Sequence, residues 1–244
     1  MLNIVQPIVS DQQLAALNAR LDTCTVCATA SRQYRHVPGG GCATKPRLML
    51  VFINPTVRNF TAHADWRGVR FPFAGKPKLW EILATAGFVR ADLPERIAAL
   101  GRTPEMVELL LHETCRQQLY LTNAVKCVDD GSRLPTTARI AAAWAFLQAE
   151  IALVQPQAIV TFGLIPFRLL TGCNVRLADQ LWDAQQGRCT FFSSHPIDGR
   201  SYSVFPCYFP TGRGNPVAAT KMLIALRQQL TAEWPLESSK PAEA

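Results

Sequence analysis

Two asparagines and a phenylalanine stand where they could act together on one ligand. Asn54 follows the apolar run 48–51 and is followed by Pro55, whereas Asn123 ends the segment Leu-Tyr-Leu-Thr-Asn of residues 119–123. Apolar runs of this length are typical of buried strands, so each amide is expected at the mouth of a strand. Phe73 comes eighteen residues after Pro55. We expect both amides and the ring to face one pocket, and a reactive site there.

The apolar pattern and the helix caps predict the elements that position these residues. Strands are predicted at residues 48–53, 119–125, 158–163 and 202–207, and helices at about 10–21, 79–86, 103–113, 136–154 and 216–230, with a short helix after residue 163. Short apolar strands that alternate with helices indicate an α/β fold with a mostly parallel sheet covered on both faces. The predicted architecture is a single three-layer domain whose central, mostly parallel four-stranded sheet is flanked by helices.

The predicted sheet also predicts where a site forms. Ligands of open parallel sheets bind at the carboxyl ends of the strands. Asn54, Asn123, Gly163 and the loop after Cys207 all fall at such ends, so the fold alone would make them converge. Neither a Walker loop nor a Gly-x-Gly-x-x-Gly fingerprint follows any strand. Their absence argues against an enzyme of nucleoside triphosphates or dinucleotides.

Length and composition limit the organisation and the partners. With 244 residues, 48% of them hydrophobic, the chain fits one domain, predicted at 1–234, with a disordered polar tail at 235–244. The net charge of +7 favours a polyanionic partner. No apolar run approaches the roughly 20 residues that cross a bilayer, and the N-terminus lacks the basic region of a secretion signal. We therefore expect a cytoplasmic monomer without a membrane partner.

Two sets of sequence motifs around these residues resemble those of a known protein family. The first set is Ile53-Asn54-Pro55, Phe71-Pro72-Phe73-Ala74, Leu79-Trp80 and Ala86-Gly87-Phe88. The second set is Cys24-x-x-Cys27, the stretch 120–127, and residues 151–156 leading into 159–163. In this order the sequence resembles the uracil-DNA glycosylase superfamily, the first set its mismatch-specific branch and the second its iron–sulfur branch. The likeness runs from residue 24 to about 227 and implies the fold of that superfamily.

The resemblance implies a role for each residue of the predicted pocket. Asn54, with Pro55 beside it, takes the place of the residue that positions water against the sugar C1′. Phe73 takes that of the ring stacking on an extruded base, and Asn123 that of the amide reading the pyrimidine edge. An amide is no strong base, so Asn54 would orient water while the site stabilises the departing base anion. The alternatives are a simple turn at Asn54-Pro55 and a core role for Phe73.

The second motif of the superfamily, His-Pro-Ser or Asn-Pro-Ser, falls on the segment 208–216. Phe209 replaces its polar residue and would, by the resemblance, line the base site, but a phenyl ring cannot donate to a pyrimidine O2. Stabilisation of the leaving group must then come from backbone N–H groups, from Thr211 or from another side chain. The change also leaves open a different base, or a chain that binds without cutting.

Several residues are predicted to contact DNA. In the loop after residue 210, glycines let backbone amides approach phosphates, and Arg213 supplies charge or a wedge into the base stack. The alternative is a surface turn without a role in DNA binding, in which the arginine is simply solvated. Lys126 is predicted to be a phosphate contact or a solvated charge, not a Schiff-base nucleophile. The predicted DNA contacts are Thr211, Gly212, Arg213, Asn215 and Lys126.

The resemblance also implies a metal centre. Cys24, Cys27 and Cys127 match ligands of the iron–sulfur relatives, whereas the fourth position falls on Ala143. We choose Cys42, in a Gly-rich loop, to complete four thiolates around a 4Fe-4S cluster. A tetrahedral zinc site and the absence of any metal remain the alternatives.

The resemblance implies a monofunctional DNA glycosylase acting in DNA repair. It would flip out a uracil or other modified pyrimidine and hydrolyse its N-glycosidic bond, leaving an abasic site. The changed Phe209 and the long insertion 56–70 motivate a second hypothesis, a defence glycosylase that excises hypermodified cytosines from phage DNA. A third, from another class, is a non-catalytic protein that binds DNA lesions or single-stranded DNA.

Overall fold

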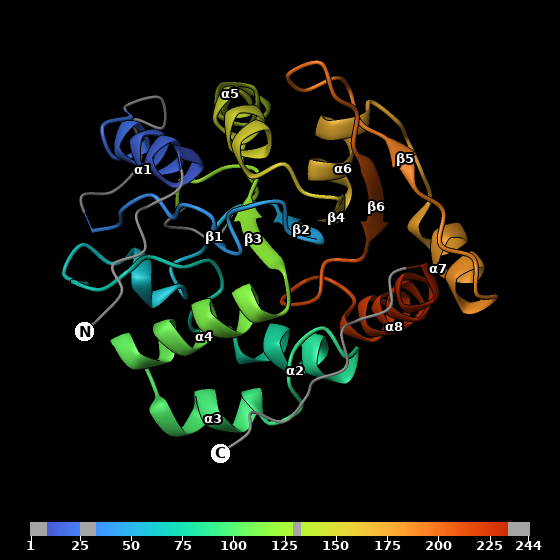
Figure 1. Ribbon diagram of the computed structural model, residues 1–244, viewed down its shortest axis with the longest axis horizontal. Coiled ribbons are helices and arrows are strands. Elements are labelled where there is room, and N and C mark those ends of the chain that lie inside the picture. Colours follow the sequence, from blue (N-terminus) through green and yellow to red (C-terminus); the bar gives the residue numbers. More distant parts are fainter. Residues whose placement is uncertain (1–8, 25–32, 129–132, 234–244) are drawn as a thin grey trace.

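A six-stranded mixed sheet crosses the middle of the molecule (Figure 1). The computed structural model describes residues 9–24, 33–128 and 133–233; the predicted tail at 235–244 lies outside these ranges. The strand order is β1-β3-β2-β4-β6-β5. The strands are β1 (Gly40–Gly41), β2 (Leu48–Phe52), β3 (Leu119–Asn123), β4 (Ala158–Phe162), β5 (Phe192–Ser193) and β6 (Ser203–Cys207). The central four are parallel, as predicted, and the two-residue edge strands β1 and β5 pair antiparallel.

Two hydrophobic cores cover the two faces of the sheet. Because side chains alternate along a strand, Leu48, Leu50 and Phe52 of β2 enter one core, and Met49 and Val51 enter the other. Every residue of β2, β3 and β4 is buried. This two-sided burial is the reason why the strands read as mostly apolar runs, with Thr122, Asn123 and Thr161 as buried polar exceptions.

Helices form the two outer layers, so the predicted three-layer architecture is confirmed (Figure 1). One face carries α1 (Val9–Asp22), α5 (Thr137–Val154) and α6 (Leu164–Thr171). The other carries α2 (Pro77–Thr85), α3 (Leu93–Leu100), α4 (Pro104–Arg116) and α8 (Pro216–Glu233), and α7 (Leu177–Gln185) packs against α8 and β6. A single 3-10 turn, η1 (Phe60–Ala62), lies between β2 and α2.

Capping threonines set the starts of α4 and α5. The hydroxyl oxygen of Thr103 accepts from the Met106 N–H at the start of α4, and that of Thr136 accepts from the Arg139 N–H at the start of α5. The helices α3 and α7 were not predicted. Neither has a side-chain cap, and α7 buries only Ala184, so its sequence signal is weak, whereas α3 buries Leu93 and Ile97 and ends at Gly101, a signal that the sequence analysis overlooked.

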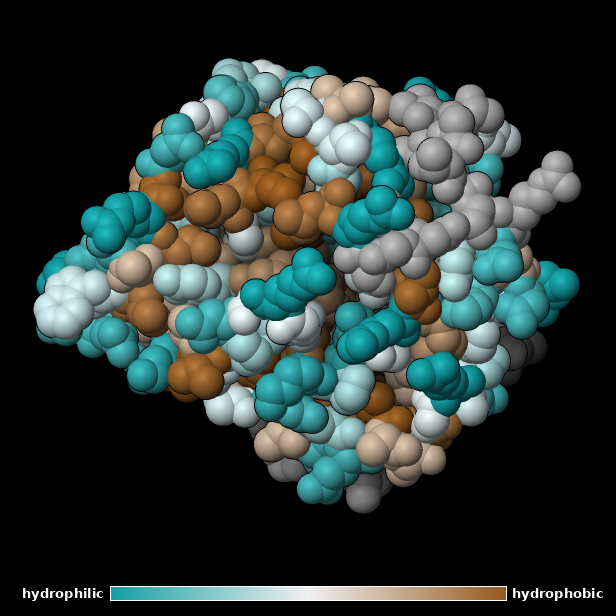
Figure 2. All heavy atoms as spheres, turned by 180° about the vertical axis from the view of Figure 1, so that it is seen from behind, coloured by the Kyte–Doolittle hydropathy of each residue, from teal (hydrophilic) through white to brown (hydrophobic). Residues whose placement is uncertain are grey.

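The helix α5 is the one described helix long and apolar enough, by length and composition, to span a membrane. Here it packs against α1 and places Leu147, Ile151 and Val154 in the core beneath it. Figure 2 shows the molecule from behind, with apolar side chains gathered on the upper part of this face and hydrophilic ones around them.

Candidate active site

A cavity of about 480 Å³ lies at the carboxyl ends of β2, β3 and β6. Four segments line it: residues 53–59, the pair Phe73 and Lys76, the β3–α5 connection, and the β6–α8 loop. The lining includes these residues singled out in the sequence: Asn54, Pro55, Phe73, Asn123, Phe209, Thr211, Gly212 and Arg213. The structure thus brings residues from distant parts of the chain to one cavity.

The register of the sheet sets Asn54 beside Asn123. Phe52, the last residue of β2, pairs with Asn123, the last residue of β3. Beyond that pair the two segments stay joined, because the Ala124 N–H donates to the Phe52 carbonyl at 2.7 Å and the Val125 N–H donates to the Ile53 carbonyl at 2.9 Å. Both amides therefore leave the sheet at the same edge.

The Asn123 side chain is buried without a hydrogen-bond partner. It is 1% exposed, and neither its Nδ2 nor its Oδ1 has a partner among the described residues. Leaving a buried polar group unsatisfied costs about 1–3 kcal/mol. Such a cost in a side chain that lines a cavity points to a ligand that supplies the missing donor and acceptor.

The Asn54 side chain is held by its nitrogen. Nδ2 donates to the Pro55 carbonyl at 3.1 Å and, at the limit of hydrogen-bonding distance, to the Arg133 carbonyl at 3.5 Å. No described residue donates to its Oδ1. The Asn54 Oδ1 is therefore available to accept a hydrogen bond from a water molecule, while the bonds of Nδ2 hold the amide group in place.

The Phe73 ring is fixed by an aromatic stack and by its backbone. Its centroid lies 3.9 Å from that of Phe52, which in turn stacks on Phe162 at 4.4 Å and 7°. Phe73 has φ 61°, in the left-handed region that non-glycine residues rarely occupy. Strained backbone of this kind is concentrated at functional sites. Its carbonyl accepts from the Lys76 N–H at 3.1 Å, which closes the turn.

The loop between β6 and α8 is tightly held. The Asn215 N–H donates to the Phe209 carbonyl at 2.9 Å, and a Cβ on Gly214 would lie 1.9 Å from that oxygen, so only glycine fits there. The Asn215 Oδ1 accepts from the Ala218 N–H at 3.0 Å and so caps α8. Thr211 is buried, whereas Arg213 is exposed at the rim. Asn215 was predicted to contact DNA, but its side-chain oxygen is already engaged in capping α8.

The structure corrects the prediction that Lys126 contacts DNA phosphate. Its side chain is 3% exposed, and its Nζ lies 2.5 Å from Glu150 Oε2 and also donates to Thr122 Oγ1. The same carboxylate accepts from Tyr120 and from the Gly39 N–H. Burial lowers the pKa of Lys126, opposed by the Glu150 charge. The chain turns after Asn123, so Lys126 faces α5 and not the cavity.

The predicted metal ligands do not come together in the described part of the chain. Cys42 donates its N–H to the Leu119 carbonyl at the start of β3, whereas Cys127 lies beyond the end of that strand. Cys127 instead packs against Ala143 in a small apolar cluster. Burial raises the pKa of the Cys42 thiol, which disfavours the thiolate.

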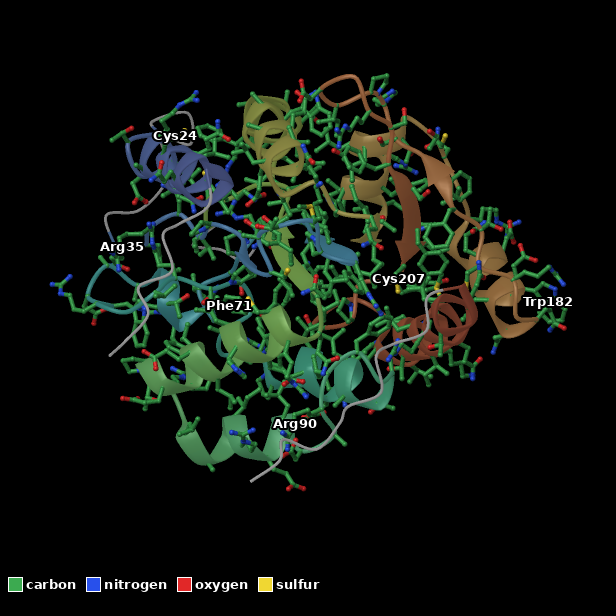
Figure 3. All side chains as sticks on the ribbon, viewed as in Figure 1. Cys24, Arg35, Phe71, Arg90, Trp182 and Cys207 are labelled. Carbon is green, nitrogen blue, oxygen red and sulfur yellow. The ribbon has the colours of Figure 1, made fainter. Side chains whose placement is uncertain are left out.

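No group of three His, Cys, Asp or Glu side chains within the described residues could hold a metal ion. Figure 3 shows Cys24 beside α1 and Cys207 across the molecule near α8. Cys27 lies outside the described residues. The described cysteines therefore do not fit a four-thiolate cluster.

Sequence reasoning missed several residues that line the cavity, and four of them add charge, an unpaired hydroxyl or apolar surface to it. Arg58 and Lys76 add positive charge, and no carboxylate is among the described residues that line the cavity. Burial, and then the charge of Arg58, lowers the pKa of Lys76. The Thr56 hydroxyl is buried without a partner among the described residues, and Leu134 stands at the mouth. All four lie in loops between strands and helices, where the sequence has no hydrophobic periodicity from which their position could be predicted.

The fold and the cavity together define a class of protein. A parallel sheet, an unsatisfied amide, a fixed aromatic ring and a cationic rim are what a protein needs to bind one flat, polar base of a polyanion. The family model of the uracil-DNA glycosylase superfamily matches residues 38–228. The chain is also similar to a type-4 uracil-DNA glycosylase of Pyrobaculum aerophilum, with 31% identity over 176 residues, which are 72% of this chain and 73% of that protein. The chain belongs to the uracil-DNA glycosylase superfamily and is a DNA glycosylase.

Proposed function

We propose that the protein is a monofunctional glycosylase that flips uracil out of DNA and hydrolyses its N-glycosidic bond, leaving an abasic site. The observation that carries this proposal is the Asn123 amide, buried at the cavity with both its polar atoms unpaired. Uracil offers a donor at N3 and an acceptor at O4, side by side. One primary amide complements both, so binding uracil would remove the cost of the unsatisfied side chain.

The Phe73 ring supports the binding of a flipped base. An extruded base loses its stacking partners, and a flat apolar surface replaces part of that interaction. The Phe73 ring packs against Phe52, which stacks on Phe162 in turn, and these contacts restrict its movement on that side. The base would lie on a preformed platform and reach Asn123 with its pyrimidine edge.

Asn54 is the residue that would orient the attacking water. Its Oδ1 accepts a hydrogen bond from water, while its Nδ2 is held by the Pro55 and Arg133 carbonyls. The water oxygen attacks C1′, the bond from C1′ to the base N1 breaks, and its electron pair leaves with the base, while the proton that the water gives up passes to solvent or to the departing base anion. An amide does not remove the proton, so the barrier falls through positioning of water and stabilisation of charge.

The leaving base needs a stabilising partner other than Phe209. The Phe209 ring packs edge-on to Phe52, at 6.3 Å between centroids, and offers no hydrogen bond. The buried Thr56 hydroxyl has no partner among the described residues, and Lys76 and Arg58 contribute positive charge. These groups would take over stabilisation of the base anion.

A second candidate substrate is a cytosine enlarged at C5, the substrate of a defence glycosylase. The cavity volume of about 480 Å³ favours it, because pockets of this size hold ligands larger than one pyrimidine ring. An amide that rotates about its last bond would present the complementary pattern of cytosine.

A 4Fe-4S cluster stays a proposal that rests only on the likeness of Cys24, Cys27 and Cys127 to ligands of the iron–sulfur relatives, because the described cysteines do not gather into a four-thiolate site. No step described above depends on it. Iron and sulfide analysis of the purified protein, with its visible absorption spectrum, tests it: a colourless, iron-free protein overturns the proposal.

The decisive experiment compares bases in otherwise identical oligonucleotides. Single- and double-stranded substrates carry uracil, hypoxanthine or a C5-modified cytosine at one position, and alkali converts each abasic site into a strand break. We expect cleavage at uracil, and cleavage at the modified cytosine alone would select the second candidate. Tight binding to these oligonucleotides without any strand break would favour a non-catalytic lesion-binding protein and overturn the proposal.

A further inference from the structure

A second cavity, of about 270 Å³, lies beside the insertion 56–70 and takes no part in the reaction described above. The described residues that line it are Phe60, His63, Asp65, Trp66, Arg67 and Arg102. All of them except Arg102 belong to the insertion, and Arg102 lies in the connection between α3 and α4. The turn η1 and that connection lie on the same side of the molecule (Figure 1). The insertion thus builds a cavity of its own.

The second cavity adjoins the first at the turn η1. Asn59 lines the first cavity, and Phe60, the next residue, lines the second. The turn between them is held in place, because Asn59 Oδ1 accepts from the Thr61 N–H at 3.2 Å and Asn59 Nδ2 donates to the Phe71 carbonyl at 3.0 Å. Neighbouring Cα atoms are only about 3.8 Å apart. A DNA strand whose base enters the first cavity therefore runs close to the second.

The Trp66 indole is a fixed surface of the second cavity. Its ring centroid lies 4.9 Å from that of Phe60, with the two rings nearly perpendicular at 79°. Its Nε1–H donates to the Val69 carbonyl at 3.1 Å, and Arg35 donates to its backbone carbonyl. Gly68 packs so closely that a Cβ there would lie 2.6 Å from the indole Cζ2. A ligand that stacks on this ring does not first have to order it.

Guanidinium groups stand beside the indole. Arg67 and Arg102 are both exposed, and Arg67 also donates to the Ala64 carbonyl at 3.2 Å. Asp65 adds one carboxylate, so the two guanidinium groups outweigh it. Proteins bind single-stranded nucleic acid with this combination, because every base has a flat face that can stack and every nucleotide carries a phosphate.

We propose that the second cavity is a subsite for an unpaired nucleotide that flanks the extruded one on the same strand. This inference rests on the proposed function, which makes DNA the ligand. The flanking base stacks on Trp66, and its phosphate pairs with Arg67 or Arg102. In a duplex the flanking base stays paired and stacked, so it does not enter. The subsite therefore contributes to the binding of single-stranded DNA and not to that of duplex DNA.

The first test removes the indole. Dissociation constants are measured for single-stranded and duplex oligonucleotides with one uracil, whose sugar carries a 2′-fluorine that slows cleavage. We expect Trp66→Ala to weaken binding of the single strand about tenfold and binding of the duplex less than about twofold. Trp66→Phe should keep most of the affinity, because a phenyl ring also stacks.

A second variant avoids the packing of Trp66 against Phe60. Arg102→Gln removes an exposed charge from the cavity, so the logarithmic salt slope of single-strand binding should fall by about 0.7. Arg96→Gln, an exposed arginine on α3 outside the lining, is the matched control and should leave the slope unchanged. An unchanged slope with Arg102→Gln would remove the phosphate contact from the proposal.

Abasic spacers beside the uracil test the stacking itself, because a spacer keeps the phosphate and lacks the base. The wild type should lose about tenfold in affinity when spacers replace the bases on the side that enters the subsite. Trp66→Ala should lose nothing further on the same oligonucleotide, since the two changes remove one interaction. Losses that add in full would show that the flanking base stacks elsewhere and would overturn the proposal.

Two more results would overturn it. Equal losses with Trp66→Ala on single strands and duplexes would assign Trp66 to the fold of the β2–α2 connection, and no loss on either would leave the cavity without a nucleotide. Because these measurements need no excision, the two proposals fail separately. A protein that shows the losses but cuts no base keeps the subsite and loses the proposed function, whereas one that cuts uracil without the losses loses only the subsite.

Discussion

Thr122 and Asn123 are neighbours on β3, yet the two faces of the strand treat their polar side chains in opposite ways. On the α5 side, Thr122 donates to Glu150 Oε2 at 2.8 Å and joins Lys126 and Tyr120 in a buried network around that carboxylate. On the cavity side, Asn123 has no partner among the described residues. A satisfied network holds the strand end in place, whereas an unsatisfied amide marks where a ligand completes the bonding.

The largest expected effect concerns the satisfied network. Glu150→Ala leaves the buried Lys126 ammonium unpaired, so we expect a loss of about 3–5 kcal/mol in the free energy of unfolding. Denaturant unfolding measures it, with the exposed Glu108→Ala as the matched control. An unchanged unfolding free energy would mean that the network contributes nothing to the fold.

The next effect concerns the water-orienting amide. Asn54→Ala should lower kcat for uracil excision by about 10²–10³-fold, because positioning of the water is lost. Base release from oligonucleotides under single-turnover conditions measures it, and the exposed Asn174→Ala serves as the control. Full activity of Asn54→Ala would remove Asn54 from the reaction.

Asn123→Leu sharpens the contrast between the two faces. Uracil excision should fall by about 10–100-fold, since the site can no longer pair with the base edge. The free energy of unfolding should stay equal or rise by about 1 kcal/mol, because an unsatisfied buried amide is removed. Kinetics and thermal unfolding of the same preparation test both. A marked loss of stability would show that the amide serves the fold, as Thr122 does.

The smallest effect concerns the cationic rim. Lys76→Gln should weaken binding to DNA of any sequence and reduce the salt dependence of the binding constant by about one unit in the logarithmic slope. Because the pKa of Lys76 is lowered, its charge and its share of the binding decline at a lower pH than for an exposed lysine. Binding titrations at several salt concentrations measure the slope. The exposed Lys221→Gln, on α8 outside the cavity lining, is the control.

The regular elements were largely predictable. The central strands begin and end within two residues of their predicted limits because burial on both faces leaves an unbroken apolar run. The prediction that Lys126 contacts DNA was wrong because the turn after β3 directs its side chain toward Glu150 on α5 and away from the cavity. Thr56, Lys76 and Leu134 were missed because only the closing of the connections around the cavity brings them there.

The sequence by itself determined the α/β fold, the parallel core of the sheet and the placing of Asn54 and Asn123 at strand ends. Local periodicity and residue type carry that information, since burial acts on each segment separately. The tertiary structure alone decided which buried polar groups find a partner. Hydrogen-bond satisfaction depends on atoms from distant segments meeting within about 3 Å, and no local pattern records whether they do.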